Sequence, residues 1–327
     1  MDYDTMLMGL NDIAITQYTE GLEEFLASTP LRKRTAYLGI DCTAPSLHVG
    51  HLVPILAMQR FCRTYQVEPH YLLGKATALI GDITDNPSKR PALTEDVVDE
   101  NCRLIEAQLN RILGSDVNLQ RNYPSEDFLE SLAPYVSVHE LLRLSVVKNC
   151  IENSVPLTLA ELCYPVLQAN DFRCYDIQFG GSDQWGNICI GISVAKRRCG
   201  DKKYGVCTKL LTYDDGSKMG KSNTNKRVIW LDRKLTSVFD FWQFFRNVKD
   251  TDLKEWLGLF TTTTYGVPHY ACRVLGIKPP ELDLSNTEII NECKVFLADY
   301  VTTLVHGIVA ALEAKSKADE MYGGIRR

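Results

Sequence analysis

The chain has 327 residues and a formal net charge of −5, with 45% hydrophobic and 24% charged residues. This composition is typical of a globular protein, and the negative charge excludes a surface that is basic all over and coats nucleic acid. The 11 cysteines form no CxxC pair and show no zinc-ligand spacing, which favours free thiols in a reducing compartment. We find no signal peptide and no apolar run of about 20 residues, so we expect a cytoplasmic protein without a membrane span and leave an organelle open.

The first elements expected along the chain are helices and strands in alternation. Residues 1–30 show apolar positions at helical spacing, which predicts an amphipathic helix. A short apolar stretch at 36–40 predicts a strand, and a helix is expected from about Leu47 after turn residues at 41–46. A second unit of strand, turn and helix is expected at 70–82. Thr94 should then cap a long helix.

The later elements begin with helices at 126–132, 138–151 and 157–172. A strand should precede the turn at 180–182, with a helix opening at Asp183. After a polar loop at 218–222 the pattern is mostly helical, with helices expected at 237–245 and 253–260 and from 285. This order predicts an α/β domain with a Rossmann-like parallel sheet over 1–230, with a helical insertion over about 95–165. An α-helical domain should follow over 231–327.

Three stretches contain candidate functional residues. Gly180-Gly181 allows a ligand close to the main chain, and the helix start after it offers N–H groups to a phosphate or ribose. His48–His51 places two imidazoles on one side of another helix start. Lys218 and Lys221 lie on a polar loop. Singly, these are explained as well by a chance string or solvated charges; together, after successive strands, they predict a nucleotide site at the carboxyl edge of a parallel sheet.

The chain resembles the class I aminoacyl-tRNA synthetases, and among them the tyrosyl-tRNA synthetases of the bacterial and mitochondrial type. His48–His51 is similar to the HIGH signature of that class, and Lys218–Ser222 (KMGKS) is similar to its KMSKS signature. Tyr37–Ala44 and Gly180–Asn187 (GGSDQWGN) resemble stretches of the tyrosyl enzymes. The resemblance extends from about residue 30 to about residue 315.

The resemblance implies roles for individual residues. Tyr37 and Asp171 would bind the phenol hydroxyl of L-tyrosine, which penalises phenylalanine because it leaves these groups unpaired. The other tyrosine contacts that it implies are Thr77, Asp82, Tyr164, Gln168 and Gln184. Those that it implies for ATP are Gly39, Asp41, Thr43, Gly50, Gly181, Asp183 and Met219. The implied catalytic residues are His48 and His51, for the phosphates, and Lys218 and Lys221, which would close over pyrophosphate from a mobile loop.

The implied reaction is the ligation of L-tyrosine to tRNA(Tyr) in two steps, through tyrosyl-adenylate. Mg²⁺ would arrive with ATP, bound mainly by phosphate oxygens, so no protein metal site and no tightly bound cofactor are expected. The implied partners are L-tyrosine, ATP, tRNA(Tyr) and a second copy of the chain, which would bind the region 95–165; no membrane is expected. We also expect the C-terminal S4-like RNA-binding module of bacterial relatives to be absent, by truncation or in a natural short form.

Two alternatives stay open at this point. A tryptophanyl-tRNA synthetase would share the fold and both signatures, although Tyr37, Asp171 and the GGSDQWGN stretch argue against it. A non-catalytic RNA-binding relative would keep the fold without aminoacylation. The presence of His48–His51, Lys218 and Lys221 argues against this second alternative.

Overall fold

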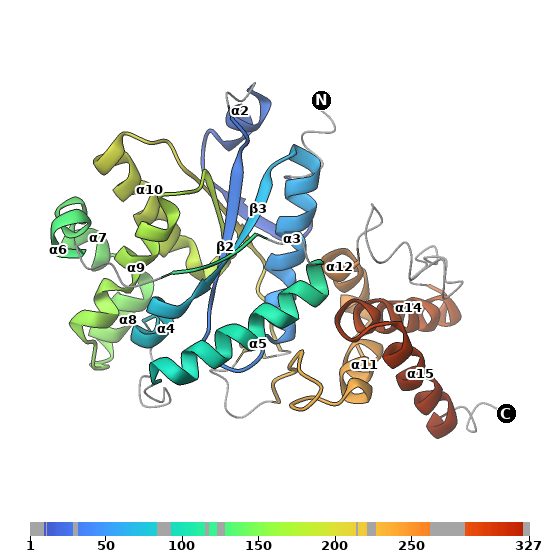
Figure 1. Cartoon of the computed structure of the whole chain (residues 1–327). Helices are drawn as coiled ribbons and strands as arrows, with labels where there is room; N and C mark the ends of the chain where they lie inside the picture. Colours follow the sequence, from blue (N-terminus) through green and yellow to red (C-terminus); the bar gives the residue numbers. More distant parts are fainter. Residues whose placement is uncertain are drawn as a thin grey trace.

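The computed structural model describes residues 10, 12–28, 32–83, 93–114, 118–122, 128–213, 215–220, 227–261 and 285–322. Its centre is a six-stranded sheet in the order β1-β6-β5-β2-β3-β4 (Figure 1). β1 pairs antiparallel with β6, and all other neighbours are parallel. The strands are β1 (Ile15–Tyr18), β2 (Thr35–Asp41), β3 (Glu68–Gly74), β4 (Asn118–Arg121), β5 (Ile177–Gly181) and β6 (Tyr204–Thr208).

Helices surround this sheet and form the C-terminal part of the chain. In the first half they are α2 (Leu22–Ala27), α3 (Val49–Tyr65), α4 (Lys75–Ile80), α5 (Glu95–Leu113), α6 (Phe128–Ser131), α7 (Val138–Leu141) and α8 (Ser145–Glu152), with a 3₁₀ turn at Ala133–Tyr135. In the second half they are α9 (Leu159–Phe172), α10 (Trp185–Cys199), α11 (Val238–Arg246), α12 (Asp250–Phe260), α14 (Thr287–His306) and α15 (Ile308–Tyr322), with a 3₁₀ turn at Ser182–Gln184.

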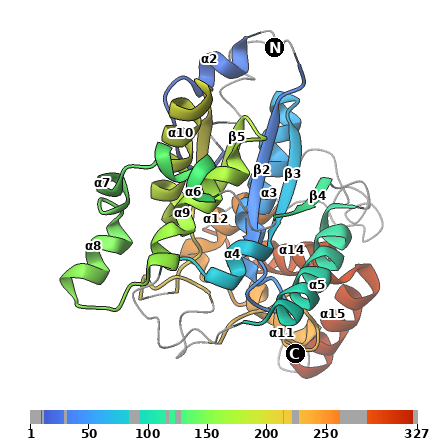
Figure 2. The same cartoon turned by 60° about the vertical axis from the view of Figure 1, so that its left-hand side comes forward.

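The side chains of β2 alternate between the two sides of the sheet, as the period of a strand requires. Ala36, Leu38 and Ile40 join the core that contains the buried face of α3. Tyr37 points to the other side, into a smaller cluster with Phe172 and Tyr175. Figure 1 shows α3 on one side of the sheet and α9 and α10 on the other. Figure 2 shows β2 and β3 side by side, with β4 beyond β3.

Two details of the predicted elements were wrong. An amphipathic helix was expected over residues 1–30, but residues 15–18 form the strand β1. Among the described residues of this segment, the helix α2 covers only 22–27. Ile15 and Tyr18 pair with residues of β6, which lies far from them in the sequence. Such long-range pairing overrides local periodicity. The helix expected over 138–151 is divided into α7 and α8.

The fold class is confirmed: a mostly parallel α/β sheet is followed by a helical C-terminal region. The domain boundary at 230 stays a prediction. Leu253 of α12 and Phe296 of α14 belong to the same hydrophobic cluster as Leu52 and Phe61 of α3. The two regions therefore share one continuous core.

Candidate active site

A cavity of about 440 Å³ lies at the carboxyl ends of β2 and β5. The chain leads from β2 to β3 on one side and from β5 to β6 on the other, so the strand order reverses between these neighbours. Ligands of open parallel sheets bind at such a point. The cavity is lined by every predicted site residue that the structure describes: Tyr37, Gly39, Asp41, Thr43, His48, Gly50, His51, Thr77, Asp82, Tyr164, Gln168, Asp171, Gly181, Asp183, Gln184, Lys218 and Met219. Lys221 lies outside the described residues.

His48 and His51 cap the first turn of α3 with their own side chains. The Nδ1 atom of His48 accepts the main-chain N–H of Gly50, and the Nδ1 atom of His51 accepts that of His48, both at 3.1 Å. An accepting nitrogen carries no proton, so each neutral ring has its hydrogen on Nε2. The two rings lie 3.9 Å apart between centroids. Two imidazole donors therefore stand at the positive end of a helix, where an anion is stabilised.

The loop that carries Lys218 packs against this helix end. Met219 donates its main-chain N–H to Leu211 at 2.7 Å. A Cβ atom on Gly50 would lie 3.0 Å from the Met219 carbonyl oxygen and 3.0 Å from the His48 ring. Glycine at position 50 thus allows a close approach that a side chain would disturb, because the loop or the His48 ring would have to shift.

Lys218 pairs with a carboxylate on the opposite wall of the cavity. Its Nζ atom lies 2.5 Å from Oδ2 of Asp183, in the 3₁₀ turn after β5. The side chains are 45% and 38% exposed, so water screens this pair and its net contribution to stability is small. The lysine is free to exchange this partner for an anion in the cavity.

Tyr37 is the cavity residue nearest the start of β2. Its side chain is buried, and its hydroxyl has no hydrogen-bond partner among the described residues. Gln178, aligned with Tyr37 on β5, has a buried Oε1 atom that also lacks one. Asp171 accepts a hydrogen bond from Asn122 at 2.9 Å. Burial raises the pKa of Asp171 to about 7, and the Asp41 carboxylate adds to the rise while the hydrogen bond from Asn122 opposes it. This group of polar atoms suits a ligand hydroxyl.

Asp41 connects two regions of the cavity. One of its carboxylate oxygens accepts the Thr77 hydroxyl at 2.6 Å, and the other accepts the Tyr164 hydroxyl at 2.8 Å. A Cβ atom on Gly74 would lie 2.3 Å from the Asp41 carboxylate, so only glycine fits at the end of β3. The residue that was expected on the ATP side therefore also holds two residues that were expected on the tyrosine side.

Acceptor atoms gather beside these residues. Gln184 donates its side-chain N–H to Asp82 at 3.1 Å and accepts one from Gln168 at 3.4 Å. The Oε1 atom of Gln168 is buried without a partner in the described part of the chain. Burial raises the pKa of Asp82 to about 6, which the hydrogen bond from Gln184 partly offsets. A carboxylate and a free amide oxygen together suit a ligand ammonium group.

The cavity lining also contains residues that were not predicted from the sequence, among them Gly74, Asn122 and Gln178. Asn122 directly follows β4, and Gln178 is a polar residue inside an otherwise apolar strand. A polar residue at such a position is a usable signal, but it points to a cavity only when the strand order is known.

Among the described residues, no group of three or more His, Cys, Asp or Glu side chains is placed to hold a metal ion. Over the same ranges, no helix is both long enough and apolar enough to cross a bilayer. The cytoplasmic location stays a prediction from the sequence.

A comparison of the chain with protein families gives one match over most of its length. The family model described as "tRNA synthetases class I (W and Y)", that is, for tryptophan and tyrosine, matches residues 29–323. The chain therefore belongs to the class I tRNA synthetases.

Similar proteins then indicate the branch of that class. The tyrosine–tRNA ligase of Paracoccus denitrificans is 37% identical over 318 residues, which cover 93% of this chain and 73% of that protein. The corresponding ligase of Borrelia recurrentis is 34% identical over 319 residues, which cover 93% and 74%. A C-terminally truncated mitochondrial tyrosyl-tRNA synthetase from Aspergillus nidulans shares the fold, with a TM-score of 0.77 at 24% identity, over 97% of this chain and 94% of that one. Within its class, the chain is thus one of the tyrosine–tRNA ligases, and neither alternative is favoured.

Proposed function

We propose that the cavity holds L-tyrosine and ATP together and joins them as tyrosyl-adenylate. A carboxylate oxygen of tyrosine attacks the α-phosphorus, the bond from this phosphorus to the bridging oxygen breaks, and pyrophosphate leaves. The ribose hydroxyl at the 3′ end of tRNA(Tyr) then attacks the tyrosyl carbonyl and releases AMP. The observation that carries this proposal is the buried hydroxyl of Tyr37, which has no partner among the described residues and lies in the cavity that Asp171 also lines.

Selection of tyrosine follows from these two groups. The ligand's phenol hydroxyl would donate to the Asp171 carboxylate and accept from the Tyr37 hydroxyl. Phenylalanine would leave the Tyr37 hydroxyl buried without a partner, which costs about 1–3 kcal/mol, and would leave Asp171 with only its hydrogen bond from Asn122. The polar groups therefore reject the smaller ligand more strongly than a purely apolar pocket would.

The backbone atoms of the bound tyrosine would lie nearer the cavity mouth. Asp82, Gln168 and Tyr164 would surround the ammonium group, and Thr77 would lie beside them. Gln184 would orient the carboxylate toward ATP. The hydrogen bond that Gln184 already makes to Asp82 supports a shared role in positioning these two ends of the amino acid.

ATP would lie between the starts of α3 and α10. Gly181 and Asp183 would contact the ribose, with Gly39, Thr43 and Met219 around the nucleoside. His48 and His51 would donate to the phosphates, with Mg²⁺ bound to phosphate oxygens as part of the substrate. Lys218, released from Asp183, and Lys221 would bind the departing pyrophosphate. No covalent nucleophile is needed, because positioning and charge stabilisation are enough for in-line transfer.

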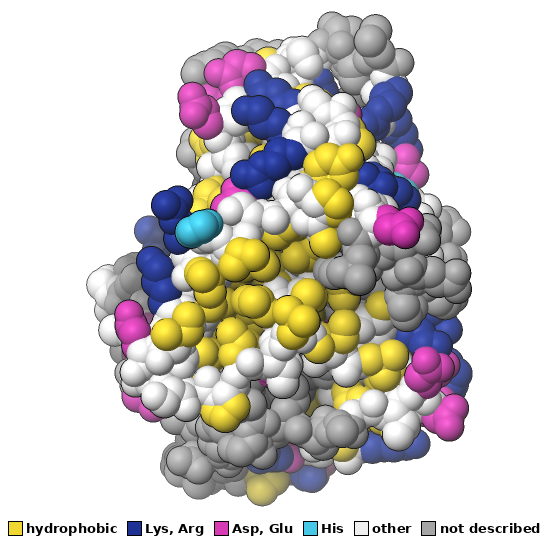
Figure 3. Space-filling model, turned by 90° about the vertical axis from the view of Figure 1, so that its left-hand side faces the viewer, with side chains coloured by type: hydrophobic (Ala, Val, Ile, Leu, Met, Phe, Trp, Pro, Cys, Tyr) yellow, Lys and Arg dark blue, Asp and Glu magenta, His cyan; other side chains and the backbone are white. Residues whose placement is uncertain are grey.

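A second copy of this chain would cover the face formed by α7, α8 and the start of α9. Val138, Ile151 and Leu159 are exposed there, and Leu159 reaches 76% exposure. Figure 3 shows hydrophobic side chains gathered on this side of the molecule. An exposed apolar patch of this kind typically marks an interface. Its position in the predicted insertion, 95–165, supports a homodimer.

The test is amino-acid-dependent exchange of pyrophosphate into ATP, run with each of the twenty amino acids. We expect exchange with tyrosine and none with phenylalanine or tryptophan. Asp171→Asn should keep ATP binding and lose the discrimination between tyrosine and phenylalanine. Exchange with another amino acid by the wild-type protein would contradict the proposal.

A further inference from the structure

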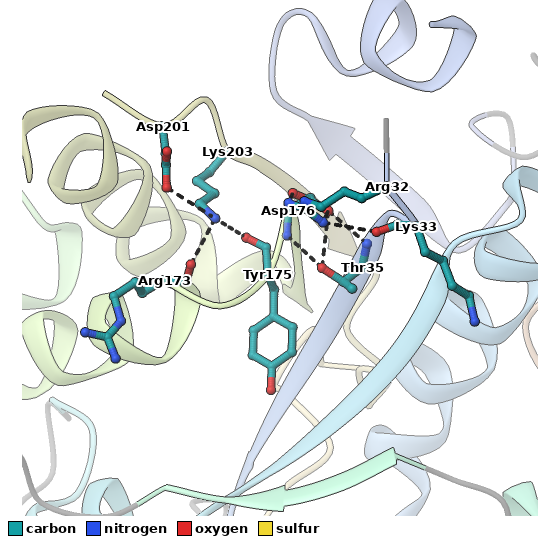
Figure 4. A network of polar contacts seen from close by, with 8 residues as sticks. All are labelled: Arg32, Lys33, Thr35, Arg173, Tyr175, Asp176, Asp201 and Lys203. Carbon is teal, nitrogen blue, oxygen red and sulfur yellow. Dashed lines mark hydrogen bonds and ion pairs between the residues drawn. The ribbon is translucent and has the colours of Figure 1, made fainter. Parts of the chain in front are cut away.

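A network of polar contacts fixes the amino ends of the central strands (Figure 4). Asp176, directly before β5, accepts the main-chain N–H of Thr35 at 2.9 Å and donates its own N–H to the Thr35 carbonyl at 3.1 Å. Arg32 binds both oxygens of the same carboxylate. The carbonyl of Asp176 accepts the N–H of Tyr204 at 2.9 Å. One residue thus holds β2, β5 and β6 together.

Lys203 holds the turn that leads into β5. Its side chain is buried, and its Nζ atom donates to the carbonyl oxygen of Tyr175 at 2.6 Å and to that of Arg173 at 3.0 Å. Asp201 lies 3.8 Å from the same ammonium group. Charge-assisted hydrogen bonds are stronger than neutral ones, and a buried carbonyl without a partner is costly. Lys203 therefore helps to fix the position of this turn.

The turn places the ring of Tyr175 against the ring of Tyr37. The ring centroids are 4.6 Å apart and the planes differ by 26°. Phe172 also contacts Tyr37, at 5.6 Å. The Tyr175 hydroxyl donates to the Gln120 side chain on β4. In Figure 4 the Tyr175 ring extends away from the polar network. Its backbone and its hydroxyl are therefore both fixed, and its flat face is left against Tyr37.

We propose that Tyr175 is a positioning residue for amino-acid specificity, and that Lys203 holds it in place. The inference rests on the proposed function, in which the Tyr37 hydroxyl binds the phenol of the substrate. Hydrogen bonds weaken steeply with distance and angle, so a Tyr37 ring that tilts loses its bond to the ligand hydroxyl. The apolar contacts that tyrosine and phenylalanine share do not depend on this tilt. Loss of Tyr175 therefore lowers discrimination between the two amino acids more than it lowers catalysis.

The first experiment compares Tyr175→Leu and Tyr175→Phe with the wild-type chain in pyrophosphate exchange. Leucine keeps an apolar side chain but removes the flat ring, whereas phenylalanine keeps the ring and removes only the bond to Gln120. We expect Tyr175→Leu to raise KM for tyrosine and to lower the ratio of kcat/KM for tyrosine over phenylalanine about tenfold. KM for ATP should stay unchanged. Tyr175→Phe should retain most of the discrimination.

The second experiment tests the role of Lys203 and leaves the rings of Tyr37 and Tyr175 unaltered. Lys203→Met removes the ammonium from the carbonyl oxygens of Tyr175 and Arg173. Lys202→Met removes the same charge from the exposed neighbouring position. We expect Lys203→Met to lose discrimination in the same way as Tyr175→Leu, and Lys202→Met to match the wild type. If Tyr175→Leu fails to fold, the comparison of Lys203→Met with Lys202→Met still tests the proposal.

The outcomes separate this inference from the proposed function. Suppose that the wild type activates tyrosine and that the variants lose kcat/KM equally for tyrosine, for phenylalanine and for ATP. Tyr175 is then only part of the core and the inference is wrong. Unchanged discrimination in folded Tyr175→Leu or Lys203→Met would overturn it as well. Failure of the wild type to activate tyrosine would instead reject the proposed function, and this inference with it.

Discussion

His48 donates its main-chain N–H to the Nδ1 atom of His51 at 3.1 Å, so the second histidine of the motif holds the first. The His48 ring in turn accepts the N–H of Gly50. The two imidazoles thus complete the first turn of α3 as a capping box. The same two side chains are proposed to bind the phosphates, so each has a role in stability and a role in the reaction.

The two roles of His48 can be separated by substitution. His48→Ala should lower the free energy of unfolding by about 1 kcal/mol, because the cap is lost. Its rate of adenylate formation should fall about 100-fold, because a donor to the transition state is lost. His48→Asp should restore the cap but place a negative charge toward the phosphates. We expect it to unfold like the wild type and to react as slowly as His48→Ala; a normal single-turnover rate in His48→Asp would contradict the phosphate assignment.

The raised pKa of Asp171 predicts a pH dependence of stability. The value of about 7 in the folded protein lies above the roughly 3.9 of an exposed aspartate, so the folded state retains this proton to higher pH. The corresponding stability is fully present below about pH 4 and is lost as the pH rises through 7. The melting temperature of ligand-free Asp171→Asn relative to the wild type should therefore increase from pH 5 to pH 8. Calorimetry checks this, and a constant difference over that range would show that Asp171 stays ionised.

Lys218 should matter for the reaction and little for folding. Its pair with Asp183 is partly exposed, so Lys218→Met should leave the melting temperature nearly unchanged. Adenylate formation should slow about 100-fold, because a cation that stabilises the departing pyrophosphate is lost, whereas tyrosine binding should stay the same. Stopped-flow fluorescence separates these two steps. Lys254→Met, on an exposed position of α12, is the matched control; equal rates in both variants would exclude Lys218 from the reaction.

The exposed apolar face predicts the oligomeric state. Wild-type protein should be a dimer in light scattering, and Leu159→Asp should be a monomer because a charge cannot be buried without a partner. Val309→Asp introduces the same charge at a position of α15 that is 66% exposed and should remain dimeric. A wild-type monomer, or dissociation of both variants alike, would contradict the proposed interface.

Much of the site could be predicted because its chemistry is local. His48–His51 begins a helix, and Gly180–Asn187 combines a strand end, a turn and a helix start, so each motif can be recognised in a short stretch of sequence. Tyr164, Gln168 and Asp171 share one face of a helix by spacing alone, and all three line the cavity.

Other features depend on which strands are neighbours, and sequence periodicity does not give that. Gln178 reaches the cavity because β5 pairs with β2 in a register that aligns it with Tyr37. Asn122 reaches the cavity because β4, which it follows in the chain, pairs with β3 at the edge of the sheet. The same reason explains β1, a four-residue strand that, within the described ranges, pairs only with β6. Its local sequence offers too little alternation to outweigh the surrounding helical pattern.

The hydrophobic cluster that α3 shares with α12 and α14 has a consequence for how the molecule comes apart. Separating the C-terminal helices from the sheet would expose apolar faces of both parts to water at once. Unfolding either part alone is therefore unfavourable. Heat should therefore melt the sheet and these helices in one cooperative step. The helix end that carries His48 and His51 is held by that same shared core, which makes the precision of the phosphate site a property of the entire fold.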